Sequence, residues 1–308
     1  MAGVGRPLFA PSAPSGDGGR GHMLSVAKVF LVGTPIGNLA DLSPRAIETL
    51  GVVDVVYAED TRRTSGLFRR FGISTPLRSL HEHNEAARSE EIVERLRSGQ
   101  SCALVTDAGA PVVSDPGARL VRAVTGAGFP VLAVPGPSAV TASVGLSGLP
   151  ADQFAFLGFP PRKGRERSEW LAQCAGSPIT IVAFEAPGRV SALLSDFRAL
   201  GLGDRSCCVC REITKLHEES RRGTVAALAD YYLQNEVRGE VTLVLEGSPD
   251  AGLARPDPES VRVLAVSLAR DGLSTREIVD RLREEFGLAR NEAYDIAVDA
   301  GEEEGRRS

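Results

Sequence analysis

The chain has 308 residues, of which 43% are hydrophobic and 24% are charged, and its formal net charge is −5. This composition is typical of a globular protein with a sizeable core and enough length for two domains. The acidic balance excludes a protein that coats nucleic acid through a dominant basic field, so any RNA partner needs a local basic patch. The sequence shows no long apolar run and no secretory signal, and we expect a cytoplasmic protein without a membrane span.

The first residues and the cysteines carry little chemistry. Residues 1–22 are rich in Gly, Pro, Ser and Arg without apolar periodicity, which predicts a disordered tail. Five cysteines are scattered through apolar stretches, which indicates buried thiols. His81 and His83 flank Glu82, but further ligands are not evident nearby, so we expect no metal site.

From residue 28 onward, short β-branched runs alternate with segments of helical period, which predicts strand–helix–strand units in a mostly parallel sheet. Ser43 and Pro44 predict the start of the first helix. A pause near residue 150 divides the chain into a cofactor-binding α/β domain (23–150) and a second α/β domain (151–250). The remainder (251–308) is interpreted as a linker, a small helical appendage and a charged tail.

Three loops rich in Gly and Pro follow expected strands of the first domain: GTPIGNLAD (33–41), TDAGAPVVSDPG (106–117) and PGPSA (135–139). In open α/β sheets, ligands bind beyond the carboxyl ends of the strands. The loops match neither the P-loop pattern nor the dinucleotide-binding glycine pattern. Asp107 and Asp115 would repel a pyrophosphate but suit a ribose hydroxyl, an ammonium or a sulfonium. We therefore favour a nucleoside with a cationic arm as the ligand.

Nine blocks of sequence point to a family: VGTPIGNLADLSPRAI, AEDTRRT, HEHNE, TDAGAPVVSDPG, VPGPSA, GFPPRKGRER, FEAPGRV, REITKLHEE and RGEVTLVLEG. With these blocks in order from about residue 28 to 247, and a weaker helical match at 257–300, the chain resembles the tetrapyrrole-methylase superfamily. Within it, the chain is most similar to the branch that methylates ribosomal RNA.

The resemblance implies two α/β domains with a cleft that holds S-adenosylmethionine, plus a small C-terminal helical appendage. It also implies 2′-O-methylation of a cytidine, conventionally at position 1402, in the decoding region of 16S rRNA or of the small ribosomal subunit, by a homodimer. The residues that it implies as cofactor contacts are Thr34, Pro35, Gly37, Asn38, Asp107, Gly109, Ala110, Pro111, Val112, Ser138 and Ala139 in the first domain and Ala186, Pro187 and Glu246 in the second.

A ribose 2′-hydroxyl is a very weak acid, so methyl transfer to it benefits from a general base or from a cation that stabilises the alkoxide. Glu185 or Asp60 is the candidate base or orienting group, and Lys215 or Arg211 is the candidate cation. The sequence leaves both choices open. The branch usually has histidine where this chain has Gly188, so we assign no imidazole there.

A basic loop, PPRKGRER (160–167), precedes an expected helix of the second domain. Candidate contacts to RNA phosphates are Arg162, Lys163, Arg165 and Arg167 in this loop, with Arg62 and Arg189 elsewhere. Further arginines that could extend the patch are Arg63, Arg69, Arg70, Arg221 and Arg222. Two alternatives stay open. One is a methyltransferase for a tetrapyrrole or another small molecule, which would need a wide hydrophobic cleft, and the other is a non-catalytic RNA-binding protein.

Overall fold

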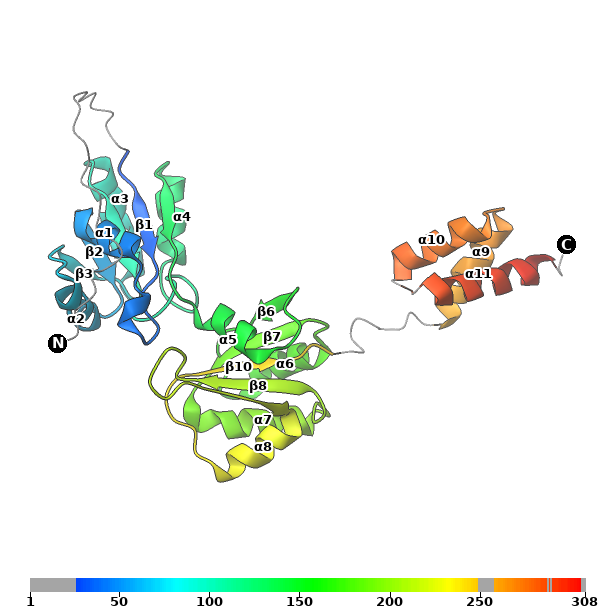
Figure 1. Ribbon diagram of the computed structural model, residues 1–308. Coiled ribbons are helices and arrows are strands. Elements are labelled where there is room, and N and C mark those ends of the chain that lie inside the picture. The colour runs from blue at the N-terminus through cyan, green and yellow to red at the C-terminus, as the bar shows by residue number, and fades with distance from the viewer. Residues whose placement is uncertain (1–25, 249–257, 287, 289, 306–308) are drawn as a thin grey trace, which may run out of the picture.

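The computed structural model describes residues 26–248, 258–286, 288 and 290–305. They form two α/β domains, each with a five-stranded sheet, and a bundle of three C-terminal helices (Figure 1). The expected fold class is therefore confirmed. The tail predicted for residues 1–22 lies outside the described residues.

All strands of the first sheet are parallel, in the order β3-β2-β4-β1-β5. The strands are β1 (Val29–Val32), β2 (Val55–Ala58), β3 (Leu77–Ser79), β4 (Cys102–Val105) and β5 (Val131–Val134). The helices are α1 (Pro44–Val52), α2 (Thr61–Phe71), α3 (Glu85–Arg97) and α4 (Ala118–Gly126). Ser43 caps α1 as predicted, because its hydroxyl accepts a hydrogen bond from the Ala46 amide at 3.1 Å.

Alternate residues of the central strands enter cores on opposite faces of this sheet. Tyr57 packs with Ile92 of α3 and Leu120 of α4, whereas its neighbour Val56 packs with Leu50 of α1 and Phe68 of α2. Every residue of β2 and β4 is buried. Burial on both faces is what a parallel sheet between two helix layers requires, and it explains the unbroken apolar runs in these strands.

The second sheet is mixed, in the order β6-β7-β10-β8-β9. The strands are β6 (Phe154–Phe156), β7 (Thr180–Glu185), β8 (Ser206–Arg211), β9 (Glu219–Thr224) and β10 (Val241–Leu245). The helices are α5 (Ala139–Ser147), α6 (Gly164–Gly176), α7 (Val190–Ala199) and α8 (Val225–Gln234). The β6–β7 pair is parallel, and β10 runs antiparallel to both β7 and β8. Strand β9 was not predicted, because this edge strand is largely polar.

Helix α5 packs on the second sheet, although it precedes the domain boundary expected near residue 150. Its Val140 and Val144 pack with Val182 of β7 and Val244 of β10 in one apolar cluster. The helix ends at Gly148, which has φ +71°. The pause seen in the sequence therefore marks a left-handed helix cap and not a break between the two packing units.

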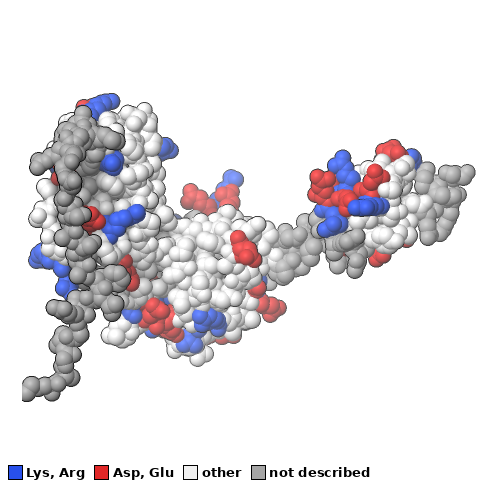
Figure 2. Space-filling view, turned by 45° about the horizontal axis from the view of Figure 1, so that its top comes forward, with Lys and Arg blue, Asp and Glu red and all other residues white. Residues whose placement is uncertain are grey.

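The C-terminal helices α9 (Pro258–Arg270), α10 (Thr275–Phe286) and α11 (Arg290–Gly305) share a separate apolar core. Ser274 and Glu277 form a capping box, with the Ser274 amide donating to Glu277 Oε2 at 2.9 Å. Residues 258–305 include six arginines, no lysine and twelve acidic residues. Figure 2 shows both signs side by side on the bundle, so no single-sign basic field forms on this face.

All five cysteines are buried and free, as predicted. Cys208 and Cys210 lie on one face of β8, with their sulfur atoms 3.6 Å apart. Among the described helices, none combines the length and the apolar character that crossing a bilayer requires.

Candidate active site

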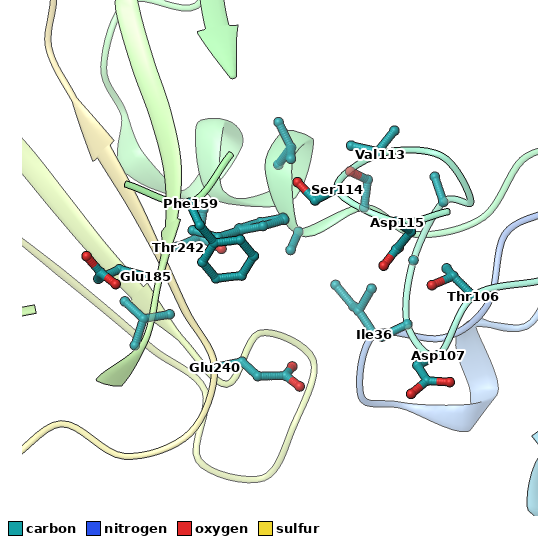
Figure 3. Close-up of a pocket in the computed structure, with 18 of the residues that line it drawn as sticks. Ile36, Thr106, Asp107, Val113, Ser114, Asp115, Phe159, Glu185, Glu240 and Thr242 are labelled. Atoms are coloured by element: carbon teal, nitrogen blue, oxygen red, sulfur yellow. The ribbon is translucent and has the colours of Figure 1, made fainter. Parts of the chain in front are cut away.

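A cavity of about 360 Å³ lies between the first and second domains. The loop after β4 forms one wall, and the end of β7, the start of β10 and the first turn of α5 form the other (Figure 3). Its lining comprises residues 106–110, 113–115, 138–140, 184–187 and 239–242, with Ile36, Arg63 and Phe159. The cavity therefore lies beyond carboxyl ends of first-domain strands, where an open α/β sheet binds its ligands.

The loops after β1 and β5 touch each other through their glycines. A Cβ on Gly33 would lie 2.6 Å from the Gly136 nitrogen, which is too close for any side chain. Next to this contact, Thr34 pairs with Gly109 through two backbone hydrogen bonds of 2.9 and 3.1 Å. The buried Thr34 hydroxyl also donates to the Thr106 carbonyl at 3.1 Å. The three expected loops thus brace one another into one rigid wall.

The loop after β4 holds two non-glycine residues in the left-handed region, Val112 with φ 77° and Ser114 with φ 63°. Such conformations are strained for residues with a side chain and persist where surrounding contacts enforce them. Asp107 supplies one such contact: its Oδ1 accepts a hydrogen bond from the Asp60 amide at 3.1 Å, and its Oδ2 lies 3.3 Å from Arg63 Nη1. Asp107 therefore ties this loop to the start of α2.

Carboxyl groups gather beside this wall. Burial, together with the neighbouring Asp115 and Asp107 carboxyls, raises the pKa of Glu59. Burial also raises the pKa of Asp115, and Asp107 adds to the effect. Asp107 and Asp115 line the cavity (Figure 3). A cationic ligand group beside these carboxyls would favour their charged form.

Glu185, at the end of β7, is the most deeply buried acid of the cavity, with a side chain that is 0% exposed. Its Oε1 accepts a hydrogen bond from the Ala186 amide at 2.8 Å, whereas its buried Oε2 has no hydrogen-bond partner. Burial raises the pKa of this carboxyl despite that amide and the nearby Arg189. An unsatisfied buried oxygen is costly, and in Figure 3 the carboxylate points away from the cavity, so a ligand hydroxyl or ammonium would meet it only if the side chain turned.

The loop between β8 and β9 is a second strained segment beside the cavity, with φ 51° at Glu212 and 68° at Thr214. The Thr214 hydroxyl accepts a hydrogen bond from the Asn38 amide at 3.0 Å, which joins the two domains. Lys215 Nζ lies 2.9 Å from Glu212 Oε1 and 3.0 Å from Oε2 of the cavity residue Glu240. Lys215 thus reaches the cavity through Glu240.

Two of the four candidate catalytic residues have structural partners instead of a place in the cavity lining. Asp60 is the N-cap of α2, accepts a hydrogen bond from the Arg62 amide at 2.8 Å and pairs with the Arg62 side chain. Arg211 pairs across the β8–β9 ladder with Glu219, Nε to Oε2, at 2.7 Å. Glu185 lines the cavity, and Lys215 contacts it indirectly.

Half of the expected cofactor residues line the cavity: Asp107, Gly109, Ala110, Ser138, Ala139, Ala186 and Pro187. Thr34, Pro35, Gly37, Asn38, Pro111 and Val112 lie in the same described loops but outside the lining. Glu246 was expected at the cofactor site but does not lie there. It lies at the opposite end of β10, next to Ser206, in a second depression. Since β10 runs antiparallel to β7, its carboxyl end points away from Ala186.

Some of the expected RNA contacts hold a loop of the protein in place, and the others are exposed at the surface. Arg189 donates to the Pro160 carbonyl at 2.9 Å, and Arg167 donates to the Pro161 carbonyl at 2.9 Å and pairs with Asp196. Both guanidinium groups therefore hold the loop before α6. The remaining expected contacts are exposed side chains: Arg62, Arg162, Lys163 and Arg165, with Arg63 at the cavity itself.

Sequence reasoning missed Phe159, Glu240 and Thr242, which all line the cavity. If β10 were parallel to its neighbours, its start would lie at the edge of the sheet opposite to the cavity, so nothing in the sequence suggested Glu240 and Thr242 there. Phe159 could have been found from the sequence, since it is an aromatic residue directly before two prolines and a basic run.

Residues 28–229 match the family model described as Tetrapyrrole (Corrin/Porphyrin) Methylases. The chain belongs to this family. It is 41% identical over 271 residues to a Synechocystis protein named ribosomal RNA small subunit methyltransferase I, covering 88% of this chain and 97% of that protein. It is 44% identical over 222 residues to a Thermotoga maritima protein of the same name, covering 72% of this chain and 99% of that protein.

Two solved structures share the fold of this chain. Cobalt precorrin-4 methyltransferase, a cobalamin biosynthetic enzyme, aligns with a TM-score of 0.57 at 20% identity, over 74% of this chain and 98% of that chain. Diphthine synthase aligns with a TM-score of 0.54 at 18% identity, over 71% of this chain and 90% of that chain. Within the described residues, no group of three or more His, Cys, Asp or Glu side chains is placed to hold a metal ion.

Proposed function

We propose that the chain transfers a methyl group from S-adenosylmethionine to the 2′-oxygen of a cytidine in the decoding region of small-subunit ribosomal RNA, conventionally position 1402. The observation that carries this proposal is the interdomain cavity, whose walls include the Gly- and Pro-rich loops that suggested the family. The chain's relatives are named ribosomal RNA small subunit methyltransferase I. We infer that the protein acts in the cytoplasm.

The residues of the cavity fit this cofactor. The cofactor supplies a methyl group on a cationic sulfonium, and Asp107 and Asp115 give the lining the opposite charge. Gly109, with φ 87°, brings backbone to the cavity where a larger residue would be strained. We expect residues 107–110, with Ser138, Ala139, Ala186 and Pro187, to hold the cofactor.

Transfer to a ribose hydroxyl requires that the acceptor oxygen be oriented and that its proton leave. Glu185 is the residue we assign to this task, because its buried Oε2 has no hydrogen-bond partner among the described residues. Its side chain is 0% exposed and would have to turn into the cavity to reach the acceptor. The raised pKa of Glu185 makes its carboxylate a stronger base than an exposed one. Lys215 is assigned a positioning role. Its ammonium group is already paired with the carboxylates of Glu212 and Glu240, and Glu240 lines the cavity.

For the RNA, we propose that the exposed Arg62, Arg162, Lys163 and Arg165 meet phosphates beside the cavity. We also propose that the protein is a homodimer. The support for this is the edge strand β5, whose Leu132 and Ala133 are exposed at the margin of the sheet.

The test is to map 2′-O-methyl groups on small-subunit rRNA from cells with and without the gene. We expect the decoding-region cytidine to lose its methyl group in the deletion and to regain it when the wild-type gene is restored. A Glu185→Ala gene serves as the matched control, since it should not restore the modification. A cytidine that stays methylated in the deletion contradicts the proposal.

A further inference from the structure

Phe159 is an aromatic side chain exposed at the cavity. It is 57% exposed although it is one of the larger apolar residues. The centroid of its ring lies 5.4 Å from that of Phe184, with 57° between the two ring planes. The Phe184 ring in turn lies 4.8 Å from the Phe156 ring, centroid to centroid. Figure 3 shows Phe159 between Glu185 on one wall and Ser114 on the other. Part of the ring therefore has protein behind it, and the rest is open to a ligand.

The segment that carries this ring is held firmly. The carbonyls of Pro160 and Pro161 accept hydrogen bonds from Arg189 and Arg167, each at 2.9 Å. On the other side, the Gly158 carbonyl accepts a hydrogen bond from the Phe184 amide at 2.9 Å. Two successive prolines further restrict the backbone. Phe159 is thus positioned before any ligand arrives, which lowers the entropy lost on binding.

The charges next to Phe159 match a nucleic acid. Arg162 and Lys163 follow it within four residues, and both are exposed. A flat apolar ring next to cations is the arrangement that binds single-stranded nucleic acid, because bases stack on the ring and phosphates meet the cations. The acidic residues Asp107 and Asp115 lie in the opposite wall, and they would repel a phosphate there.

We propose that Phe159 is the stacking platform for the target nucleobase. Proteins that read single-stranded RNA commonly splay a base out and stack it on an aromatic side chain. Stacking on Phe159 would hold the extruded base beside the cavity and present its ribose to Glu185. The proposal rests on the proposed function, and it adds a residue that determines how the RNA substrate is held.

The test compares three substitutions of Phe159 with a matched aromatic elsewhere. Phe159→Ala removes the ring, Phe159→Leu keeps apolar bulk without a flat face, and Phe159→Trp keeps a flat face. Phe154→Ala is the control, because Phe154 begins the same β6 region, is 37% exposed and does not line the cavity. The measurements are KM for small ribosomal subunits that lack the modification and Kd for S-adenosylmethionine.

Removing a base–aromatic stack costs about 1–3 kcal/mol, which corresponds to roughly a 5- to 150-fold change. We expect Phe159→Ala and Phe159→Leu to raise KM for the subunit by that factor, with Kd for the cofactor unchanged within about twofold. Phe159→Trp and Phe154→Ala should behave like the wild type. A weaker cofactor Kd with unchanged KM would instead assign the ring to the adenine, and no change in either constant would overturn the proposal.

A binding measurement separates this inference from the proposed function. The probe is a short single-stranded RNA of the decoding region with 2-aminopurine at the target nucleotide, whose fluorescence falls on stacking. We expect the wild type to quench it and Phe159→Leu not to. Equal quenching by both proteins would contradict the role of Phe159, whereas quenching without methyl transfer by the wild type would contradict the proposed function alone.

Discussion

Glu185 and Arg189 face each other across the start of the helical turn that follows β7, with Arg189 Nε 3.3 Å from Glu185 Oε1. The same guanidinium donates to the Pro160 carbonyl. The candidate base and the segment that carries Phe159 are therefore oriented by one side chain. A change at Arg189 should affect both features, whereas a change at Glu185 tests the chemistry more directly.

Glu185→Gln keeps the shape of the side chain but removes its basicity. We expect turnover to fall by about 10²- to 10⁴-fold, the usual contribution of a general base, while Kd for S-adenosylmethionine changes little. Single-turnover methyl transfer and equilibrium binding measure the two quantities. Asp60→Asn is the control, because Asp60 caps α2 outside the cavity lining; its turnover should stay close to the wild type. Wild-type turnover in Glu185→Gln would remove Glu185 from the reaction.

The raised pKa of Glu185 has a consequence for stability. The folded protein keeps this proton at pH values where the unfolded chain has released it. The contribution to stability is thus complete below the ordinary carboxyl pKa and is lost as pH rises through the higher folded pKa. Denaturation at several pH values should show the wild type losing stability relative to Glu185→Gln on going from acid to neutral pH, and a constant difference would contradict this.

Gly33→Ala should disrupt the wall of the cavity. The new Cβ would meet the backbone of Gly136 at 2.6 and 2.7 Å, and backbone cannot move aside cheaply. We expect a loss of about 1–3 kcal/mol in the free energy of unfolding and a weaker cofactor Kd. Gly51→Ala, within α1, meets no atom within 4 Å and should gain about 0.5 kcal/mol instead. Urea denaturation compares the two, and equal stability would show that the loops separate easily.

Glu91 holds together the helix layer behind β2 and β3. Burial works to raise its pKa, but hydrogen bonds from Tyr57, Arg88 and Arg95 hold the pKa at about 2. The Tyr57 hydroxyl donates to Glu91 Oε1 at 2.9 Å. We expect Glu91→Ala to destabilise the protein by about 1.5–3 kcal/mol, the range for hydrogen bonds to charged groups.

The control for this substitution lies on the same helix. Glu94 pairs with Arg97 at the surface, and its side chain is 69% exposed, so Glu94→Ala should change stability by less than about 1 kcal/mol. Because the folded pKa of Glu91 is lowered, its contribution is present above the ordinary carboxyl pKa and is lost as pH falls toward about 2. A wild-type advantage over Glu91→Ala that persists unchanged at pH 2 would contradict this assignment.

Arg162 and Lys163 should set the salt dependence of RNA binding. Replacing both by Ala removes two candidate phosphate contacts, so the slope of log K against log salt concentration should become shallower by about 1.4 for a single strand. Binding of decoding-region RNA at several salt concentrations gives the slope. Arg198→Ala, which alters a surface pair with Asp230 on α7 and α8, should leave it unchanged. An unaltered slope in the double variant would place the RNA elsewhere.

Local patterns predicted the first domain well, because its strands are unbroken apolar runs and its helices carry caps such as Ser43. They did not reveal strand direction in the second domain, which depends on pairing between distant segments. Glu246 was misplaced for this reason, and Val241 and Thr242 were overlooked at the end of β10 that lines the cavity. Neither could the sequence show which arginines are used internally, since the carbonyl partners of Arg167 and Arg189 become neighbours only in the fold.

Because all five thiols are buried, the natural chain can be used directly for site-specific labelling of an introduced cysteine. A cysteine introduced at an exposed position, such as Arg162, would be the thiol that a reagent reaches first in the folded protein, without prior removal of Cys102 or any of the others. A fluorophore or spin label attached there would report directly on the loop beside Phe159. The approach of RNA and the binding of cofactor could then be followed separately in the same molecule.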